Sequence, residues 1–172
     1  MHREARALVA AGEPQQALIA LERIPHGSAA SQPWLDRADA HLALHQLPQA
    51  AFALRVTEEL DTRVPVTAVQ GALSQAALAL AQGQPDAAIA ALELRARPHI
   101  RLQPYEFYVF DRIGLPGQLL PRVELLQQTG EHLELYRRLA ELYRQGGRSA
   151  DAAWAEQQAA ALEALLVAEP RP

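Results

Sequence analysis

The sequence contains no cysteine, no lysine and no asparagine. Without cysteine the chain has no disulfide, no thiolate zinc site and no cysteine nucleophile. Without asparagine it has no acceptor for N-glycosylation. No apolar run approaches the roughly eighteen residues of a membrane span, and the N-terminus lacks the apolar stretch of a signal peptide. We therefore predict no membrane-spanning segment, and the compartment stays open.

What the chain does contain points to helices. It has 172 residues, of which 49% are hydrophobic, enough for one domain with a real core and too many for a disordered chain. Alanine and leucine dominate, both strong helix formers, while β-branched residues are scarce. All 16 basic residues are arginine, and the net charge of −4 argues against a general nucleic-acid binder. The composition predicts an all-α protein, and we expect no cofactor.

Turn signals recur at a nearly even spacing along the chain. The markers Gly12, Gln46, Gly83, Gly117 and Gly147 are separated by 34, 37, 34 and 30 residues. Spacing of this size is typical of helical repeat arrays, and short linkers force neighbouring helices to be antiparallel. We expect a single domain, 1–172, of five helix pairs near 2–24, 33–60, 67–96, 104–129 and 132–167. Their helices are expected at 2–11 and 14–24, 33–45 and 48–60, 67–82 and 85–96, 104–113 and 118–129, and 132–145 and 149–167.

The pairs contain small and aromatic residues in a recurring order. The order is clearest in the last pair, at Tyr136, Leu139, Ala140, Tyr143, Gly147 and Ala152. Trp34, Ala38, His41 and Ala50 follow it in the second pair, and Ala5, Leu8, Gly12, Ala17 and Leu21 in the first. Ala76, Ala79, Gly83, Ala88 and Leu92 follow it in the third pair, whereas the aromatic segment 105–110 departs from it in the fourth.

In this order the chain resembles the tetratricopeptide repeat (TPR) family, whose unit is about 34 residues long. The resemblance implies an α–α superhelix, a TPR-like solenoid whose first helices line a concave face where partners bind. It implies a non-catalytic protein–protein interaction scaffold that binds a peptide or a helix of a partner protein on that face. One branch of the family grips a partner's terminal carboxylate with lysine and asparagine, and this chain has neither.

Two groups of residues are candidates for partner binding. The first is an aromatic cluster with flanking charges, and we select Tyr105, Tyr108, Asp111 and Arg112 from it. Such a patch stacks on a peptide side chain or a sugar ring, with arginine as a forked donor. The alternative is that its Phe107 and Phe110 face belongs to the core and its tyrosine face is half buried.

The second group is Arg137, Glu141 and Arg144, which share one helix face at i, i+4 and i+7. Two arginines on one groove face would suit a carboxylate of the partner. The alternative is a solvated face in which Arg–Glu pairs contribute only a few tenths of a kcal/mol each.

Signatures of catalysis and metal binding are weak. His41 and His45 are expected at i, i+4 on one helix, a spacing that can hold a divalent metal, but no third ligand is near in sequence. The chain lacks a phosphate-binding glycine loop and a Gly-x-Ser-x-Gly motif. We therefore predict neither an enzyme nor a metal site.

Two further expectations concern partners. Alanine-rich TPR arrays resembling this one occur in bacterial envelope proteins that secrete exopolysaccharide, so a periplasmic carbohydrate-binding module is the alternative function. The localisation is unknown, and the candidates are the bacterial cytoplasm and the periplasm. A solenoid needs polar ends, and the first helix starts abruptly at residue 2, so its N-terminal edge is a candidate for self-association.

Overall fold

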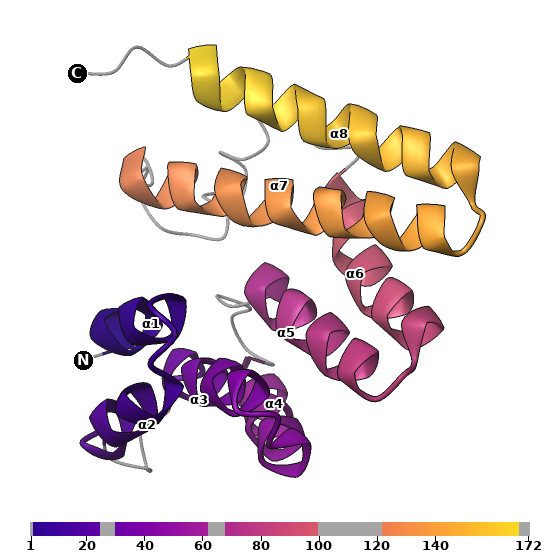
Figure 1. Cartoon of the computed structure of the whole chain (residues 1–172). Helices are drawn as coiled ribbons and strands as arrows, with labels where there is room; N and C mark the ends of the chain where they lie inside the picture. The colour runs from indigo at the N-terminus through magenta and orange to yellow at the C-terminus, as the bar shows by residue number, and fades with distance from the viewer. Residues whose placement is uncertain (1, 25–29, 62–67, 100–121, 169–172) are drawn as a thin grey trace. The chain divides into compact units, whose positions relative to one another are not determined.

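The computed structural model describes residues 2–24, 30–61, 68–99 and 122–168. Within these ranges every regular element is an α-helix, so the all-α class is confirmed (Figure 1). The helices are α1 (His2–Ala10), α2 (Pro14–Glu22), α3 (Gln32–Ala43), α4 (Leu47–Asp61), α5 (Ala68–Ala81), α6 (Pro85–His99), α7 (Arg122–Gln145) and α8 (Ser149–Ala168). Among them, none is both long enough and apolar enough to cross a membrane.

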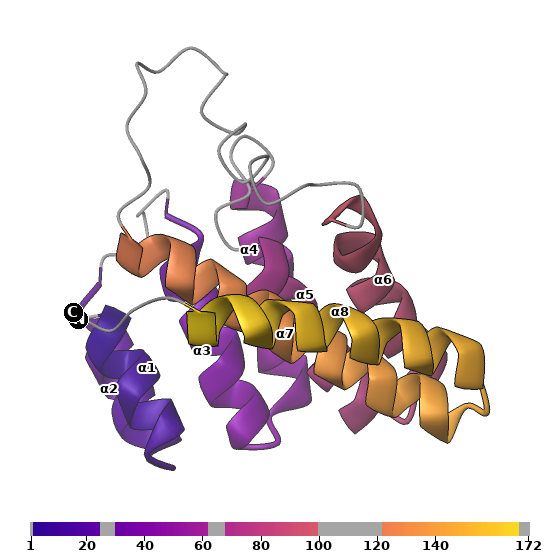
Figure 2. The same cartoon turned by 90° about the horizontal axis from the view of Figure 1, so that it is seen from above.

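The chain divides into two compact units, Met1–Ala91 and Leu92–Pro172. In the first unit, α3 packs against its hairpin partner α4 and also against α1, α2 and α5. In the second unit, α7 and α8 lie side by side and antiparallel, as both views show (Figures 1 and 2). The expected single repeat domain stays a prediction.

Four helix hairpins close through the same turn. In each, one residue takes a positive φ, and we call it the turn residue: Gly12 (79°), His45 (55°), Gly83 (74°) and Gly147 (71°). The N–H of the next residue bonds back to the carbonyl five positions earlier, as in Glu13 to Leu8 (2.8 Å) and Arg148 to Tyr143 (2.8 Å). This is the Schellman closure, which satisfies free carbonyls at a helix C-terminus and favours glycine because glycine has no Cβ. The turns near Gly12, Gly83 and Gly147 are confirmed, and in the second hairpin the turn residue is His45, one position before the predicted marker.

Small buried residues hold the same place in every one of these hairpins. Seven positions before the turn residue stands a buried alanine: Ala5, Ala38, Ala76 and Ala140. Five positions after it stands another: Ala17, Ala50, Ala88 and Ala152. A methyl side chain at both positions lets two helices approach closely, which explains why the sequence repeats alanine there.

The core of the first unit is built around these alanines. Ala5, Ala17, Leu21 and Ala40 form one buried cluster, with Leu8, Val9, Leu18 and Ile24 packed against it. Leu35, Ala38, Ala53 and Leu54 form a second, flanked by Trp34 and Leu78. Because both clusters include residues of α3, this helix organises the unit.

The core of the second unit depends on tyrosines as well as leucines. Leu135 and Leu139 are fully buried, and Tyr136 and Tyr143 are almost so. The Tyr136 hydroxyl donates to the carbonyl of Ala96 in α6 (3.1 Å). Burial raises the pKa of both Tyr136 and Tyr143 to about 12, because a buried phenolate is poorly solvated. These tyrosines therefore fix α7 against the end of α6.

One predicted break between helices is absent. The sequence suggests separate helices at 118–129 and 132–145, whereas α7 runs unbroken from Arg122 to Gln145. Gly130 lies inside it without a positive φ. Neither proline nor a second glycine occurs in residues 131–140 directly after Gly130, and a lone glycine costs a helix only about 1 kcal/mol, too little to end it. The predicted helix 104–113 lies outside the described residues.

Candidate functional site

The aromatic candidates from the sequence cannot be placed. Tyr105, Tyr108, Asp111 and Arg112 all belong to 100–121, outside the described ranges. Their role in partner binding stays a prediction.

The arginine candidates lie on the exposed side of α7, and each has a partner within the α7–α8 hairpin. Arg137 pairs with Glu163 of α8. Arg144 donates from Nε and Nη2 to one oxygen of Glu156 at 2.9 and 2.8 Å. Glu141 accepts from Arg138 at 3.3 Å. Exposed ion pairs of this kind add little to the stability of the fold. A partner carboxylate that binds Arg137 or Arg144 would have to compete with the glutamate already paired with that guanidinium group.

The two histidines do not share a helix face as the sequence suggests. Helix α3 ends at Ala43, and His45 is the turn residue of the hairpin. His41 instead makes a contact of 2.7 Å between Nδ1 and Gln46 Oε1. Over the described residues, no group of three histidine, aspartate or glutamate side chains is arranged to hold a metal ion.

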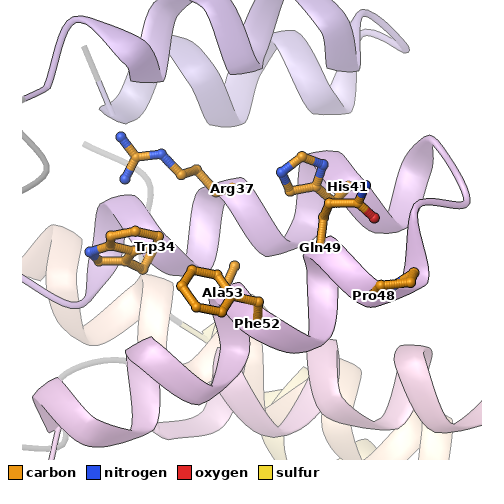
Figure 3. A pocket seen from close by; sticks show the side chains of 7 residues that line it. All are labelled: Trp34, Arg37, His41, Pro48, Gln49, Phe52 and Ala53. Atoms are coloured by element: carbon orange, nitrogen blue, oxygen red, sulfur yellow. The ribbon is translucent and has the colours of Figure 1, made fainter.

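A different site appears between α3 and α4, and we call it the aromatic hollow. It is an open depression of about 450 Å³ lined by Trp34, Arg37, His41, Pro48, Gln49, Phe52 and Ala53 (Figure 3). Trp34 and Phe52 meet edge to face, with ring centroids 6.0 Å apart. Phe52 nevertheless leaves 50% of its surface exposed. A half-exposed phenylalanine beside a tryptophan is a feature that partner surfaces share.

Arg37 forms the basic wall of the hollow. Its guanidinium lies 4.7 Å from the Trp34 ring centroid, and its Nη2 donates to the carbonyl of Leu21 at 2.8 Å. That carbonyl belongs to the last turn of α2 and also accepts from the backbone N–H of Ile24 at 3.1 Å. Burial lowers the pKa of Arg37, although Asp36 and Glu22 act in the opposite direction. Arg37 is thus both a cap for α2 and a desolvated cation.

Comparison of equivalent positions explains why the hollow is open. Counted from the turn residue, Arg37 and His41 correspond to Leu139 and Tyr143 in the α7–α8 hairpin. Arg37 is buried like Leu139, whereas His41 is only half buried and Tyr143 is buried. The aromatic pair itself recurs, because Tyr136 and Trp154 occupy the positions of Trp34 and Phe52 and also meet edge to face, at 5.7 Å. In the α3–α4 hairpin the aromatic pair therefore has Arg37 and His41 beside it, where the α7–α8 hairpin has Leu139 and Tyr143.

A second depression, of about 330 Å³, lies on the side of the first unit formed by α1, α3 and α5. Its polar groups bond one another across helices. Ser74 and Gln70 of α5 donate to Asp39 of α3 at 2.5 and 3.2 Å. Arg6 of α1 lies 3.7 Å from the Asp36 carboxylate. These contacts join α3 to α5 through Asp39 and to α1 through Asp36.

Sequence reasoning missed the aromatic hollow for a definable reason. Trp34 is assigned a packing role by the repeat pattern, and Phe52 is one apolar residue in an apolar helix. The available signal is positional: seven places after the turn residue stand Ile19, Phe52, Ala90 and Trp154. Ile19 is 56% exposed and Phe52 is 50% exposed.

The comparisons with known proteins add no assignment. No protein-family model matches the chain, and searches of curated proteins and of solved structures find no significant similarity.

Proposed function

We propose that this chain is a non-catalytic interaction scaffold that binds a segment of a partner protein in the aromatic hollow. The observation on which the proposal depends is the exposure of Phe52 beside Trp34 on two well-packed helices. Binding energy at protein interfaces concentrates in aromatic and arginine side chains that sit in such depressions. A shallow open hollow suits an inserted side chain better than an enclosed substrate.

A helical repeat of the TPR type is part of the same proposal. Its support is the recurrence of one turn geometry and of two buried alanines in four hairpins. In a repeat array each hairpin contacts only its neighbours and the surfaces between them are free for partners. The aromatic hollow is formed by one such hairpin, α3–α4, whose Arg37 also contacts α2.

The test is selection of ligands from a display library of random peptides on the purified chain. Selected peptides are then titrated against Phe52→Ala, which we expect to weaken binding by about 1–2 kcal/mol, as for a hot-spot aromatic residue. Its matched control is Ile19→Ala, because Ile19 has similar exposure at the equivalent position of α2 but does not line the hollow. Equal loss in both variants, or no selected peptide, would refute the assignment.

The carbohydrate alternative rests on Tyr105, Phe107 and Tyr108, which lie outside the described residues. Titration with neutral and acidic oligosaccharides distinguishes it. Saturable sugar binding by a chain that selects no peptide would replace the protein-partner proposal by this one.

A further inference from the structure

The lining of the aromatic hollow has charge of one sign. Of its seven residues, Arg37 is cationic and none is acidic. On the rim, one turn beyond the lining, the Arg55 guanidinium lies 5.4 Å from the Phe52 ring centroid. Cations therefore stand on both aromatic rings of the hollow.

Neither arginine is neutralised by a close carboxylate of the described helices. The described ion pairs involve Arg6, Arg137, Arg138, Arg144 and Arg148, and Asp36 and Glu22 act on Arg37 from beyond ion-pair distance. A guanidinium has five N–H donors, and Leu21 takes one from Arg37. A carboxylate entering the hollow would replace the hydration that burial removes from Arg37.

We infer that the occupant of the aromatic hollow is an acidic peptide segment. A bulky apolar side chain inserts beside Trp34 and Phe52, and an adjacent aspartate or glutamate pairs with Arg37 or Arg55. This rests on the proposed function and adds the chemistry of the partner. Charge complementarity selects the segment, because a neutral segment brings no carboxylate to Arg37 and Arg55 and a basic one is repelled.

The probes are three end-blocked hexapeptides with one central phenylalanine. Its neighbours are glutamate and aspartate in the first peptide, their amides in the second and arginine in the third. Binding is followed by the fluorescence of Trp34 in a Trp154→Phe background, because the chain has only these two tryptophans. Calorimetric titration of the unmodified chain provides an independent affinity.

We expect the acidic peptide to bind about tenfold more tightly than its amide counterpart, since charge-assisted hydrogen bonds are the stronger kind. High salt should reduce this difference severalfold, because a rim-exposed pair is screened. Arg55→Gln should weaken the acidic peptide about three- to fivefold and leave the amide peptide unchanged. The matched control is Arg95→Gln, on α6, which removes one positive charge from a residue that does not line the hollow.

A blocking variant keeps the test independent of unfolding. His41→Tyr introduces the side chain that Tyr143 presents at the equivalent position of α7, so the fold should tolerate it and the hollow should be filled. We expect loss of binding of all three peptides with an unchanged helical circular dichroism spectrum.

The outcomes separate the inference from the function on which it rests. Equal affinity for the acidic and amide peptides, or preference for the basic one, would overturn the acidic partner while leaving a peptide-binding hollow. Acidic-peptide binding that survives His41→Tyr would overturn the location. If none of the three peptides binds while the random library yields Phe52-dependent ligands, the acidic inference fails and the proposed function stands.

Discussion

The hydroxyl of Tyr143 donates a hydrogen bond of 2.7 Å to Oε1 of Glu93, joining α7 to α6. The same Glu93 oxygen lies 3.3 Å from Arg148 Nη2, and the Arg148 guanidinium lies 4.4 Å from the Tyr143 ring centroid. One buried tyrosine thus connects a carboxylate on α6 with the arginine of the α7–α8 turn.

Removal of this hydroxyl should destabilise the second unit. We expect Tyr143→Phe to lower the free energy of unfolding by about 1–2 kcal/mol, because a hydrogen bond to a charged acceptor is lost while the ring stays packed. Urea denaturation followed by circular dichroism measures it. Tyr136→Phe is the control, since its hydroxyl bonds the neutral carbonyl of Ala96 and should contribute less. A larger loss for Tyr136→Phe would contradict the assignment.

Alkaline pH should unfold the chain through these tyrosines. Their pKa is about 12 in the folded state and about 10 in the unfolded chain, so unfolding releases protons between these values. Stability is complete below pH 10 and falls as pH rises toward 12. The chain has no lysine or cysteine to titrate in this range. Denaturation curves at stepwise pH should show the decline, and the double variant Tyr136→Phe/Tyr143→Phe should flatten it.

Glycine in place of His45 should increase the stability of the fold. A non-glycine residue at φ 55° suffers a contact between its Cβ and backbone that glycine avoids. We expect His45→Gly to raise the free energy of unfolding by about 0.5–1 kcal/mol. The reciprocal change, Gly83→Ala, should lower it by about 1 kcal/mol, because that φ is 74°. Thermal denaturation measures the stability of both variants. A change in the same direction for His45→Gly and Gly83→Ala would contradict the prediction.

The contribution of Asp39 to the free energy of unfolding should depend on whether its carboxyl group is ionised. Burial raises its pKa more than the hydrogen bonds from Ser74 and Gln70 lower it. A carboxyl group with a raised pKa stabilises the fold at acid pH, and that contribution falls as pH rises through the folded-state pKa. Asp39→Asn loses one of the two oxygen acceptors that Ser74 and Gln70 use, and we expect the resulting loss of stability to be smaller at pH 7 than near pH 4. Urea denaturation at both pH values measures the difference, and a variant less stable at pH 7 than at pH 4, relative to the original chain, would contradict it.

The sequence predicts the position of a turn well where the turn depends on a single residue type such as glycine or proline. Glycine followed by proline marks the α1–α2 and α5–α6 turns, because only glycine takes the positive φ without strain and proline begins the next helix. The α3–α4 turn is displaced by one position since His45 has no such signature. Gly130 shows the converse case, in which glycine alone does not end a helix.

The candidate site is harder to predict because exposure depends on neighbours distant in sequence. Phe52 and Trp154 occupy equivalent positions, yet only Phe52 is half exposed, owing to what packs at the positions of Arg37 and His41. Likewise, the α7 pattern placed Arg137 and Arg144 on one face, but their partners are set by where Glu163 and Glu156 fall on α8.

The common turn has a consequence for how such a chain changes length. Each hairpin completes its closing hydrogen bonds between residues five positions apart, without help from any other hairpin. Deletion or duplication of one whole helix hairpin would leave the closing hydrogen bonds of every other hairpin intact. A deletion that ends inside a turn would leave carbonyl groups at a helix C-terminus without hydrogen-bond donors. Natural variants of this architecture should therefore differ by whole couples, and recombination points should cluster in the segments that link one couple to the next.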